Sequence, residues 1–322
     1  MPISREVITE QLNRLPEIQH WPDVAQIFLR TKDIPHPDWE VPVLACIAVG
    51  GREENAFAGA TAVACLQISI MLVDDILDDD PRGEHLRRGT GPTANLALAF
   101  QAAATRILTT APAPETAKIA ALNSLGKAGL ATAYGQSLDI QNLNGEEQYW
   151  HVVEAKSTPF YGAIYEIGAY LGGADAQTAS ALYEFGKLIG EMIQIEDDLA
   201  DAFAIPANAD WLQGRNNLLI LYGLTVDHPY QPQFEEIRNH IQDMQNLQKA
   251  QSYLIECGAV SYATYQLVTR FQAARQTLNV LNLPYPEHLN DMLDAYLQML
   301  ANRLKLAIPD LALEDFINLI SS

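Results

Sequence analysis

Residues 62–80 read AVACLQISIMLVDDILDDD, an apolar run of helical period that ends in five carboxylates. On a helix, Asp74, Asp75 and Asp78 occupy positions i, i+1 and i+4 and can converge on one point. Such a cluster repels itself, so it destabilises the helix end unless a cation compensates it. Carboxylate oxygens are the ligands that Mg²⁺ prefers. The stretch therefore predicts a magnesium site at the end of a buried helix.

The same spacing occurs a second time, in Asp197, Asp198 and Asp201, which follow the mostly apolar run 188–195. The two motifs begin 197 − 74 = 123 residues apart, so they must lie on different helices. In helical bundles, sites are built in the core by side chains on facing helices. Two facing triads could hold several Mg²⁺ ions, which would clamp a diphosphate and assist its departure as Lewis acids. One acidic run is usually a solvated face, but the repetition favours a metal site.

The composition limits the partners. The chain has 322 residues with Lys+Arg 20 against Asp+Glu 40, a formal charge of −20, which makes nucleic acid and anionic membranes poor partners. Cys46, Cys65 and Cys257 lie in apolar helical contexts and are interpreted as core residues in a reducing compartment. The polar segment 1–15 does not have the form of a signal peptide, and we expect no transmembrane helix. These features predict a cytoplasmic protein.

Long apolar helical patterns with short Gly- and Pro-containing joints run through the chain, without β alternation or an internal repeat. They predict an all-α fold, with a single domain over residues 1–322 and a central active-site cavity. Residues 1–35 would form an N-terminal helical segment and residues 36–322 a catalytic bundle. Helices are expected near 8–29, 42–49, 54–77, 93–110, 115–143, 146–171, 176–202, 233–257, 259–281 and 286–304, with a loop at 81–92.

Basic residues near the acidic motifs could complete a diphosphate clamp, because diphosphate oxygens favour Arg forks and Lys ammonium groups. Arg87 and Arg88 follow the first motif in the expected loop. Lys156 lies on an intervening helix beside Pro159, which should kink that helix. Arg215 follows the second motif and is the weakest candidate of the four. For each residue alone, an ordinary surface charge is the simpler interpretation.

At these positions the chain resembles the trans-isoprenyl diphosphate synthases, the all-helical class I isoprenoid synthases. The resemblance is carried by D-D-I-L-D (74–78), R-R-G (87–89), G-Q-S-L-D-I (135–140), K-S-T (156–158) and Q-I-E-D-D-L-A-D (194–201). Gln67 also falls where that family often has Gln or His. The motifs keep the family's order over about residues 40–220, which makes the resemblance specific.

The resemblance implies a role for each of these residues. The metal ligands would be the acids of the two motifs: Asp74 and Asp78 for two Mg²⁺ ions, Asp197 for a third, and Asp75, Asp198 and Asp201 in support. The residues that bind the diphosphate substrates would be Arg87, Arg88, Lys156, Gln194, Arg215 and Gln67. Ionisation of an allylic prenyl diphosphate would depend on Asp74, Asp78, Asp197 and Lys156 and would give a carbocation inside an apolar tunnel. A homodimer is expected by the same analogy.

One part of the family's pattern is missing. The family carries Gly-Gly-Lys-x-x-Arg-Pro, whose Lys and Arg bind the diphosphate of isopentenyl diphosphate, the nucleophilic partner. With Pro42 as the anchor, the Lys position is Asp38 and the Arg position is Val41. An acid at a phosphate site reverses the sign of the interaction. Residues that could replace the missing cations are Arg88, Arg30, Lys32 and Arg82.

Three functions stay open. The first is prenyl transfer, to isopentenyl diphosphate in a modified site or to another acceptor, and it is favoured. The second is a terpene synthase, which cyclises its own allylic cation and needs no second diphosphate site. The third, a non-catalytic subunit of a hetero-oligomeric synthase, is disfavoured because both acidic motifs are complete. In that family, bulk at the fourth and fifth positions before the first Asp closes the floor of the tunnel. Here these positions are Ile70 and Ser69, neither of them aromatic, so the resemblance implies room for a chain longer than fifteen carbons and an allylic substrate of the C15–C20 class.

Overall fold

The computed structural model describes residues 5–30, 36–142, 145–215 and 217–307. These residues are helical and contain no strand, which confirms the all-α prediction. The elements in chain order are α1 (Arg5–Asn13), α2 (Pro16–Gln19), α3 (Pro22–Arg30), the 3₁₀ helix η2 (Pro37–Trp39), α4 (Val41–Ala48), α5 (Glu53–Leu77), α6 (His85–Arg88), α7 (Thr90–Leu108), α8 (Glu115–Asp139), α9 (Glu146–Lys156), α10 (Thr158–Leu171), α11 (Ala176–Ala202), α12 (Ala209–Gln213), α13 (Leu218–Thr225), α14 (Gln231–Arg238), α15 (Met244–Glu256), α16 (Ala259–Val280) and α17 (Glu287–Ala307).

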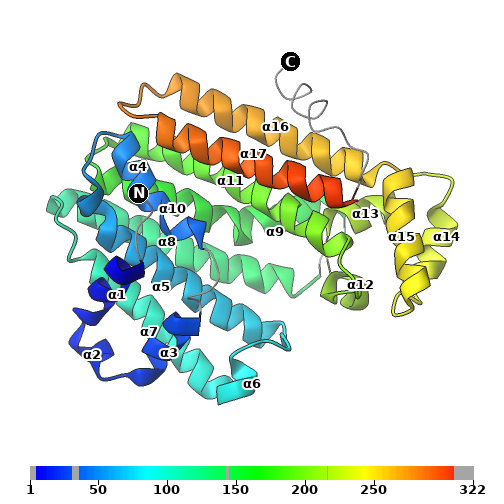
Figure 1. Cartoon of the computed structure of the whole chain (residues 1–322), viewed down its shortest axis with the longest axis horizontal. Helices are drawn as coiled ribbons and strands as arrows, with labels where there is room; N and C mark the ends of the chain where they lie inside the picture. The colour runs from blue at the N-terminus through cyan, green and yellow to red at the C-terminus, as the bar shows by residue number, and fades with distance from the viewer. Residues whose placement is uncertain (1–4, 31–35, 143–144, 216, 308–322) are drawn as a thin grey trace.

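Helix α10 lies at the centre of the bundle, where it packs along α11 and also contacts α4, α5 and α8 (Figure 1). On the outer side of α11 lie α16 and α17, and α14 and α15 pack together at one end of the molecule. The N-terminal helices α1 and α3 lie against α7, and α1 also contacts α5. One hydrophobic cluster extends through these elements from Ile8 to Leu293.

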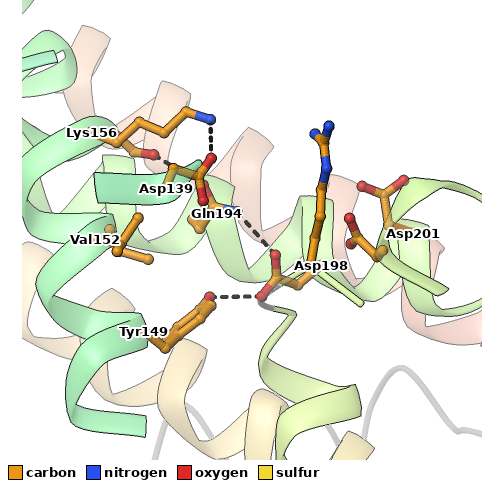
Figure 2. A pocket seen from close by; sticks show the side chains of 11 residues that line it. Asp139, Tyr149, Val152, Lys156, Gln194, Asp198 and Asp201 are labelled. Carbon is orange, nitrogen blue, oxygen red and sulfur yellow. Dashed lines mark hydrogen bonds and ion pairs between the residues drawn. The ribbon is translucent and has the colours of Figure 1, made fainter. Parts of the chain in front are cut away.

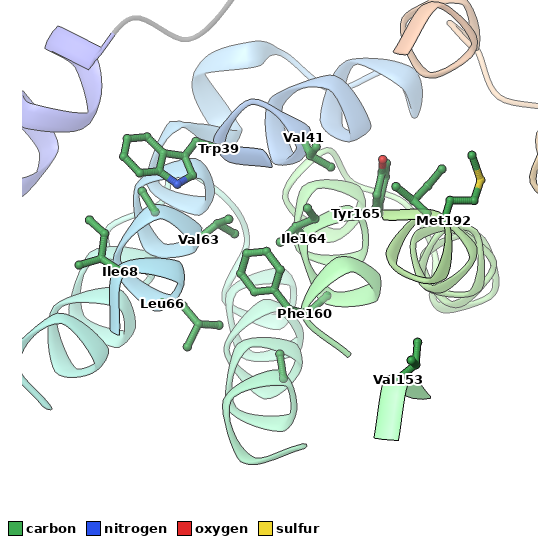
Figure 3. Packing of buried hydrophobic residues seen from close by; sticks show 14 of the residues in the cluster. Trp39, Val41, Val63, Leu66, Ile68, Val153, Phe160, Ile164, Tyr165 and Met192 are labelled. Atoms are coloured by element: carbon green, nitrogen blue, oxygen red, sulfur yellow. The ribbon is translucent and has the colours of Figure 1, made fainter. Parts of the chain in front are cut away.

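The core between α5, α10 and α11 fixes the relative position of the two acidic motifs (Figure 3). Phe160 and Ile164 of α10 lie opposite Val63 and Leu66 of α5, and all four are buried. Burial of a side chain of this size contributes about 1.5–3 kcal/mol. Because α10 packs on both α5 and α11, the helices that carry the motifs are held through this shared layer.

Helix α5 bears on the expectation that the chain has no transmembrane helix. It is long and apolar enough to cross a membrane by length and composition, with a mean hydropathy of 2.0 in its most apolar window. Of that window, 72% is buried inside the protein, so α5 is a core helix. Small residues allow this burial: a Cβ added at Gly59 would lie 2.7 Å from the Leu171 side chain of α10.

Three predicted boundaries differ from the structure. The expected helix 146–171 is two helices, since Pro159 lies in the first turn of α10 and cannot continue the hydrogen bonds of α9. Lys156 is therefore the last residue of α9, at a junction rather than within a helix. The expected helix 233–257 is divided into α14 and α15, and the expected loop 81–92 contains the short helix α6.

Candidate active site

The acidic end of α5 forms one side of the site. Asp78 closes the helix, with its backbone N–H 2.8 Å from the carbonyl of Asp74. Burial raises the pKa of Asp74 to about 6, and the nearby ammonium group of Lys156 acts against this rise. Asp78 Oδ2 lies 3.0 Å from a guanidinium nitrogen of Arg215. The weakest cation candidate of the sequence is therefore in direct contact with the first motif.

Asp75 takes a different direction from its neighbours. Its carboxylate faces the turn of residues 80–85, where burial raises its pKa, the charge of Asp80 adds to the rise and the backbone N–H of Glu84 opposes it. Arg82 lies in this turn and forms an ion pair of 2.9 Å with Asp80. Asp75 thus belongs to the turn beside the motif, and Arg82 is bound to an acid of the same run.

Helix α11 supplies the opposite side. Asp197 and Asp201 line a cavity of about 430 Å³ together with Asp74. Lys156 and Gln194 line the same cavity. The structure therefore brings together acids from both motifs, as the sequence predicts, with one cation between them.

The donor set suits a magnesium ion that is shared with a ligand. Among the described residues, no three acidic, His or Cys side chains are placed to hold a metal by themselves. Mg²⁺ commonly takes one or two protein carboxylates together with substrate phosphates and water. Asp74 and Asp78 on one side and Asp197 and Asp201 on the other are the residues that would hold such ions.

Lys156 is positioned by an acidic residue to which the sequence alone gave no role (Figure 2). Its Nζ lies 2.6 Å from Oδ2 of Asp139, the last residue of α8. Burial lowers the pKa of Lys156, but the charges of Asp139 and Asp74 outweigh it and raise the pKa overall. The ammonium group therefore stays charged beside the cavity, where it can attract an anion. The G-Q-S-L-D-I motif contains Asp139 and was the signal that could have identified it.

The adjacent arginines of α6 both contact Glu84 and lie away from this cavity. Arg87 is about half exposed and lies 3.5 Å from Glu84. Arg88 is mostly buried, and its guanidinium group donates to Glu84, Asp23 and Gln26, the last at 2.7 Å. Neither residue lines the 430 Å³ cavity. The structure thus binds Arg88 to the N-terminal helix α3 and does not place it as a substrate ligand.

Asp198 also differs from its predicted place. It is buried and does not line the 430 Å³ cavity. Its carboxylate accepts hydrogen bonds from the hydroxyl of Tyr149 at 2.7 Å and the amide of Gln194 at 2.9 Å (Figure 2). It also accepts from the backbone N–H of Leu218 at 2.7 Å. Burial raises the pKa of Asp198 to about 8, and the three donors oppose the rise. Asp198 therefore anchors the start of α13, and it lines a separate cavity of about 130 Å³ that Lys156, Gln194 and Asp201 also line.

A second wall of the cavity contains Gln67 and Tyr161. Behind them lies Asp38, which is 9% exposed and accepts a hydrogen bond of 2.8 Å from Nε2 of Gln67. Val41 is buried in the first turn of α4. The side chain of Arg30 and the whole of Lys32 lie outside the described residues. Among the described residues, the carboxylate of Asp38 contacts the amide of Gln67 and the hydroxyl of Tyr161.

Beyond Asp74 the site continues into an apolar pocket between α5, α7 and α8. This pocket of about 90 Å³ includes Ile70, Ser69 and Gln136, and Ile70 also lines the larger cavity. Ser69 donates to the carbonyl of Ala97 at 2.8 Å, so its hydroxyl is satisfied. The amide of Gln136 is buried without a protein partner in the described part of the chain, and sequence pattern alone gave no sign of it.

Comparison with known proteins agrees with this fold. The family model described as polyprenyl synthetase matches residues 41–255. The chain is 27% identical over 252 residues to a geranylgeranyl diphosphate synthase of Methanosarcina mazei, covering 75% of this chain and 78% of the relative. It is 28% identical over 261 residues to a geranylfarnesyl diphosphate synthase of Natronomonas pharaonis, covering 72% and 71%.

Solved structures show the same fold. A geranylgeranyl pyrophosphate synthetase of Geoglobus acetivorans superimposes with a TM-score of 0.73 at 21% identity, over 90% of this chain and 97% of that one. A decaprenyl diphosphate synthase of Rhodobacter capsulatus gives 0.79 at 17% identity, over 92% and 95%.

The fold and the matched residues define an all-helical isoprenoid synthase. The chain belongs to the polyprenyl synthetase family and is a prenyltransferase of the isoprenyl diphosphate synthase type.

Proposed function

We propose that the protein is a Mg²⁺-dependent enzyme that ionises an allylic prenyl diphosphate and transfers the prenyl cation to an acceptor. The observation that carries this proposal is the single cavity lined by Asp74, Asp197, Asp201 and Lys156. Acids from two helices face one ammonium group there, beside an apolar pocket suited to a hydrocarbon chain. The relatives are named for geranylgeranyl and geranylfarnesyl diphosphates, which have twenty and twenty-five carbons. Because one five-carbon addition would make them from allylic substrates of fifteen and twenty carbons, these names support a substrate of that length.

Each group has a defined part in the reaction. Asp74, Asp78, Asp197 and Asp201 would hold up to three Mg²⁺ ions, which would supply positive charge to the departing diphosphate. Lys156, charged and held by Asp139, binds a diphosphate oxygen, and Arg215 at Asp78 provides a second cation. Both therefore stabilise the charge that develops as the C–O bond breaks. Phe160 and Tyr161 line the cavity and exclude water from the cation.

The protein is incubated with Mg²⁺ and geranylgeranyl diphosphate, and inorganic diphosphate is measured. Asp74→Ala and Asp197→Ala should abolish release while thermal unfolding stays within a few degrees of wild type, and a chelator should do the same reversibly. Asp79→Asn is the matched control, because this acid of the same run is 91% exposed at its side chain. Normal turnover by either alanine variant would refute the metal-site assignment.

A second candidate function is cyclisation of the same substrate by a terpene synthase. It is supported by Asp38, a carboxylate that lies behind Gln67 and Tyr161, at a position where a second diphosphate would require a cation. The same incubation separates the two, since a cyclase forms a hydrocarbon or terpene alcohol from the allylic substrate alone. A single domain in the cytoplasm, present as a homodimer, completes the proposal.

A further inference from the structure

The wall formed by Gln67 and Tyr161 has an acid behind it. Asp38 accepts from Nε2 of Gln67 at 2.8 Å and from the hydroxyl of Tyr161. Burial raises the pKa of Asp38, and both hydrogen bonds act against the rise. No Lys or Arg among the described residues forms an ion pair with this carboxylate. Gln67 and Tyr161 themselves line the cavity, so they connect Asp38 to whatever binds there.

The orientation of Gln67 is fixed by Trp39. The indole Nε1–H of Trp39 donates to Oε1 of Gln67 at 2.6 Å, and an indole can only donate. The amide oxygen must therefore face Trp39 and the amide nitrogen must face Asp38. The side chains of Gln67, Trp39 and Tyr161 are uncharged, so this network offers no positive charge to a ligand in the cavity.

Among the described residues, no Lys or Arg contacts Gln67, Tyr161 or Asp38. Among the described residues that line the 430 Å³ cavity, Lys156 is the one cation, and it is beside the metal-binding acids. Arg88 is bound by Asp23, Glu84 and Gln26. At an effective dielectric of about 20, like unit charges about 8 Å apart weaken binding roughly thirtyfold. A second diphosphate at this wall would be repelled by Asp38, and no cation of the described residues is placed there to compensate.

We propose that the acceptor of this enzyme is an uncharged nucleophile with a hydroxyl or N–H group, which binds against Gln67 and Tyr161, and is not a second diphosphate. The inference rests on the proposed ionisation of an allylic diphosphate, and a prenyltransferase must take an acceptor. A polar wall of amide and phenol groups opposite an apolar pocket fits such a molecule. It matches neither a highly charged acceptor nor a purely hydrocarbon one.

The wall also supplies a path for the proton. Diphosphate leaves with the electrons of the C–O bond, and the lone pair of the acceptor oxygen or nitrogen forms the new bond to the allylic carbon. The acceptor then loses its proton to the oxygen of Tyr161, while the hydroxyl proton of Tyr161 passes to Asp38. The products are the prenylated acceptor, inorganic diphosphate and a protonated Asp38, which releases the proton after turnover.

The test uses wild-type enzyme with Mg²⁺ and geranylgeranyl diphosphate in four arms: no acceptor, isopentenyl diphosphate, isopentenol and indole. Isopentenol has the alkene of isopentenyl diphosphate without its charge. Inorganic diphosphate and the organic products are measured separately. We expect prenylated isopentenol or indole and no chain-lengthened diphosphate. A longer diphosphate formed at micromolar isopentenyl diphosphate would overturn the inference, and so would hydrocarbon alone in every arm. No diphosphate release in any arm would instead refute the proposed function.

Two variants test the wall itself. Asp38→Asn and Tyr161→Phe should each slow transfer to the uncharged acceptor at least tenfold in kcat and flatten its rise with pH. Asp38→Asn alone should also tighten inhibition by isopentenyl diphosphate about tenfold. Tyr165→Phe is the matched control, a buried tyrosine of the same helix whose hydroxyl contacts Met292. If Asp38→Asn does not fold, the test rests on Tyr161→Phe. If the rate of transfer and its dependence on pH are unchanged in that variant, the proton path is refuted.

Discussion

Asp198 and Asp197 are adjacent acids in one motif, and the structure predicts opposite consequences of removing them. In Asp198→Ala, the buried hydroxyl of Tyr149 and the backbone N–H of Leu218 lose their acceptor, while Gln194 can turn toward the cavity. A buried unsatisfied donor costs about 1–3 kcal/mol. Relief of the buried carboxylate offsets part of this, so we expect a net loss of about 3 kcal/mol. Asp197 is exposed, and its removal should change stability by less than about 0.5 kcal/mol.

These energies translate into unfolding temperatures. An unfolding entropy of about 2.1 cal/mol/K per residue, applied to 322 residues, gives about 0.7 kcal/mol/K. Asp198→Ala should therefore lower Tm by about 4–5 °C, and Asp197→Ala by less than about 1 °C. Differential scanning calorimetry measures both, and diphosphate release is assayed in parallel at a temperature where both variants are folded. Asp197→Ala should be inactive, whereas Asp198→Ala should keep measurable turnover. A stable but inactive Asp198→Ala would show that this carboxylate is a metal ligand and would refute the reasoning.

Three further predictions concern helix packing, pH and the N-terminal contact. Gly135→Ala should lose about 1–3 kcal/mol in urea unfolding, because its Cβ would lie 2.3 Å from the backbone nitrogen of Lys156, whereas Gly126→Ala, with open space, should gain about 0.5–1 kcal/mol. Burial raises the pKa of Asp210 from 3.8 to about 6, so this group's contribution to stability falls as pH rises through that range. The free energy of unfolding of Asp210→Asn, relative to that of wild type, should therefore rise by up to about 3 kcal/mol from pH 4 to pH 6. Parallel curves of stability against pH for the two proteins would contradict this. Arg88→Ala should lose about 1–2 kcal/mol yet leave the KM for geranylgeranyl diphosphate unchanged, and a tenfold higher KM would return this residue to the substrate site.

The helical period of the sequence was sufficient to predict the long elements. α5, α8 and α11 begin and end within a few residues of their predicted bounds, because their apolar patterns are long and their joints contain Gly or Pro. The short helices α12 and α13 were missed, since a few helical residues carry too little periodicity. α13 also depends on a distant contact, the carboxylate of Asp198 at its first N–H.

The sequence was sufficient to predict the chemical groups of the candidate site, but not which of these side chains point into the cavity. The side chains of adjacent helical residues point about 100° apart, and nothing in the local sequence says which of Asp197 and Asp198 faces the cavity that Asp74 lines. Arg88 is bound by Asp23, which is 88 − 23 = 65 residues away, and local pattern cannot anticipate such a pair. By contrast, the acid at position 38 was recognisable from a motif, and the structure adds its partners Gln67 and Tyr161.

The burial of α5 has a consequence for biosynthesis. The helix is complete once Leu77 has left the ribosome. It packs on α4 and α7, which lie near it in the chain, but also on the central helix α10, which begins only at Thr158. At a translation rate of about 5–20 residues per second, this interval of roughly 80 residues lasts about 4–16 seconds. During that time the nascent chain leaves exposed the face of α5 that packs on α10, in a helix apolar enough to span a membrane. Recombinant production should therefore respond to slower growth at low temperature and to added chaperones that hold apolar segments.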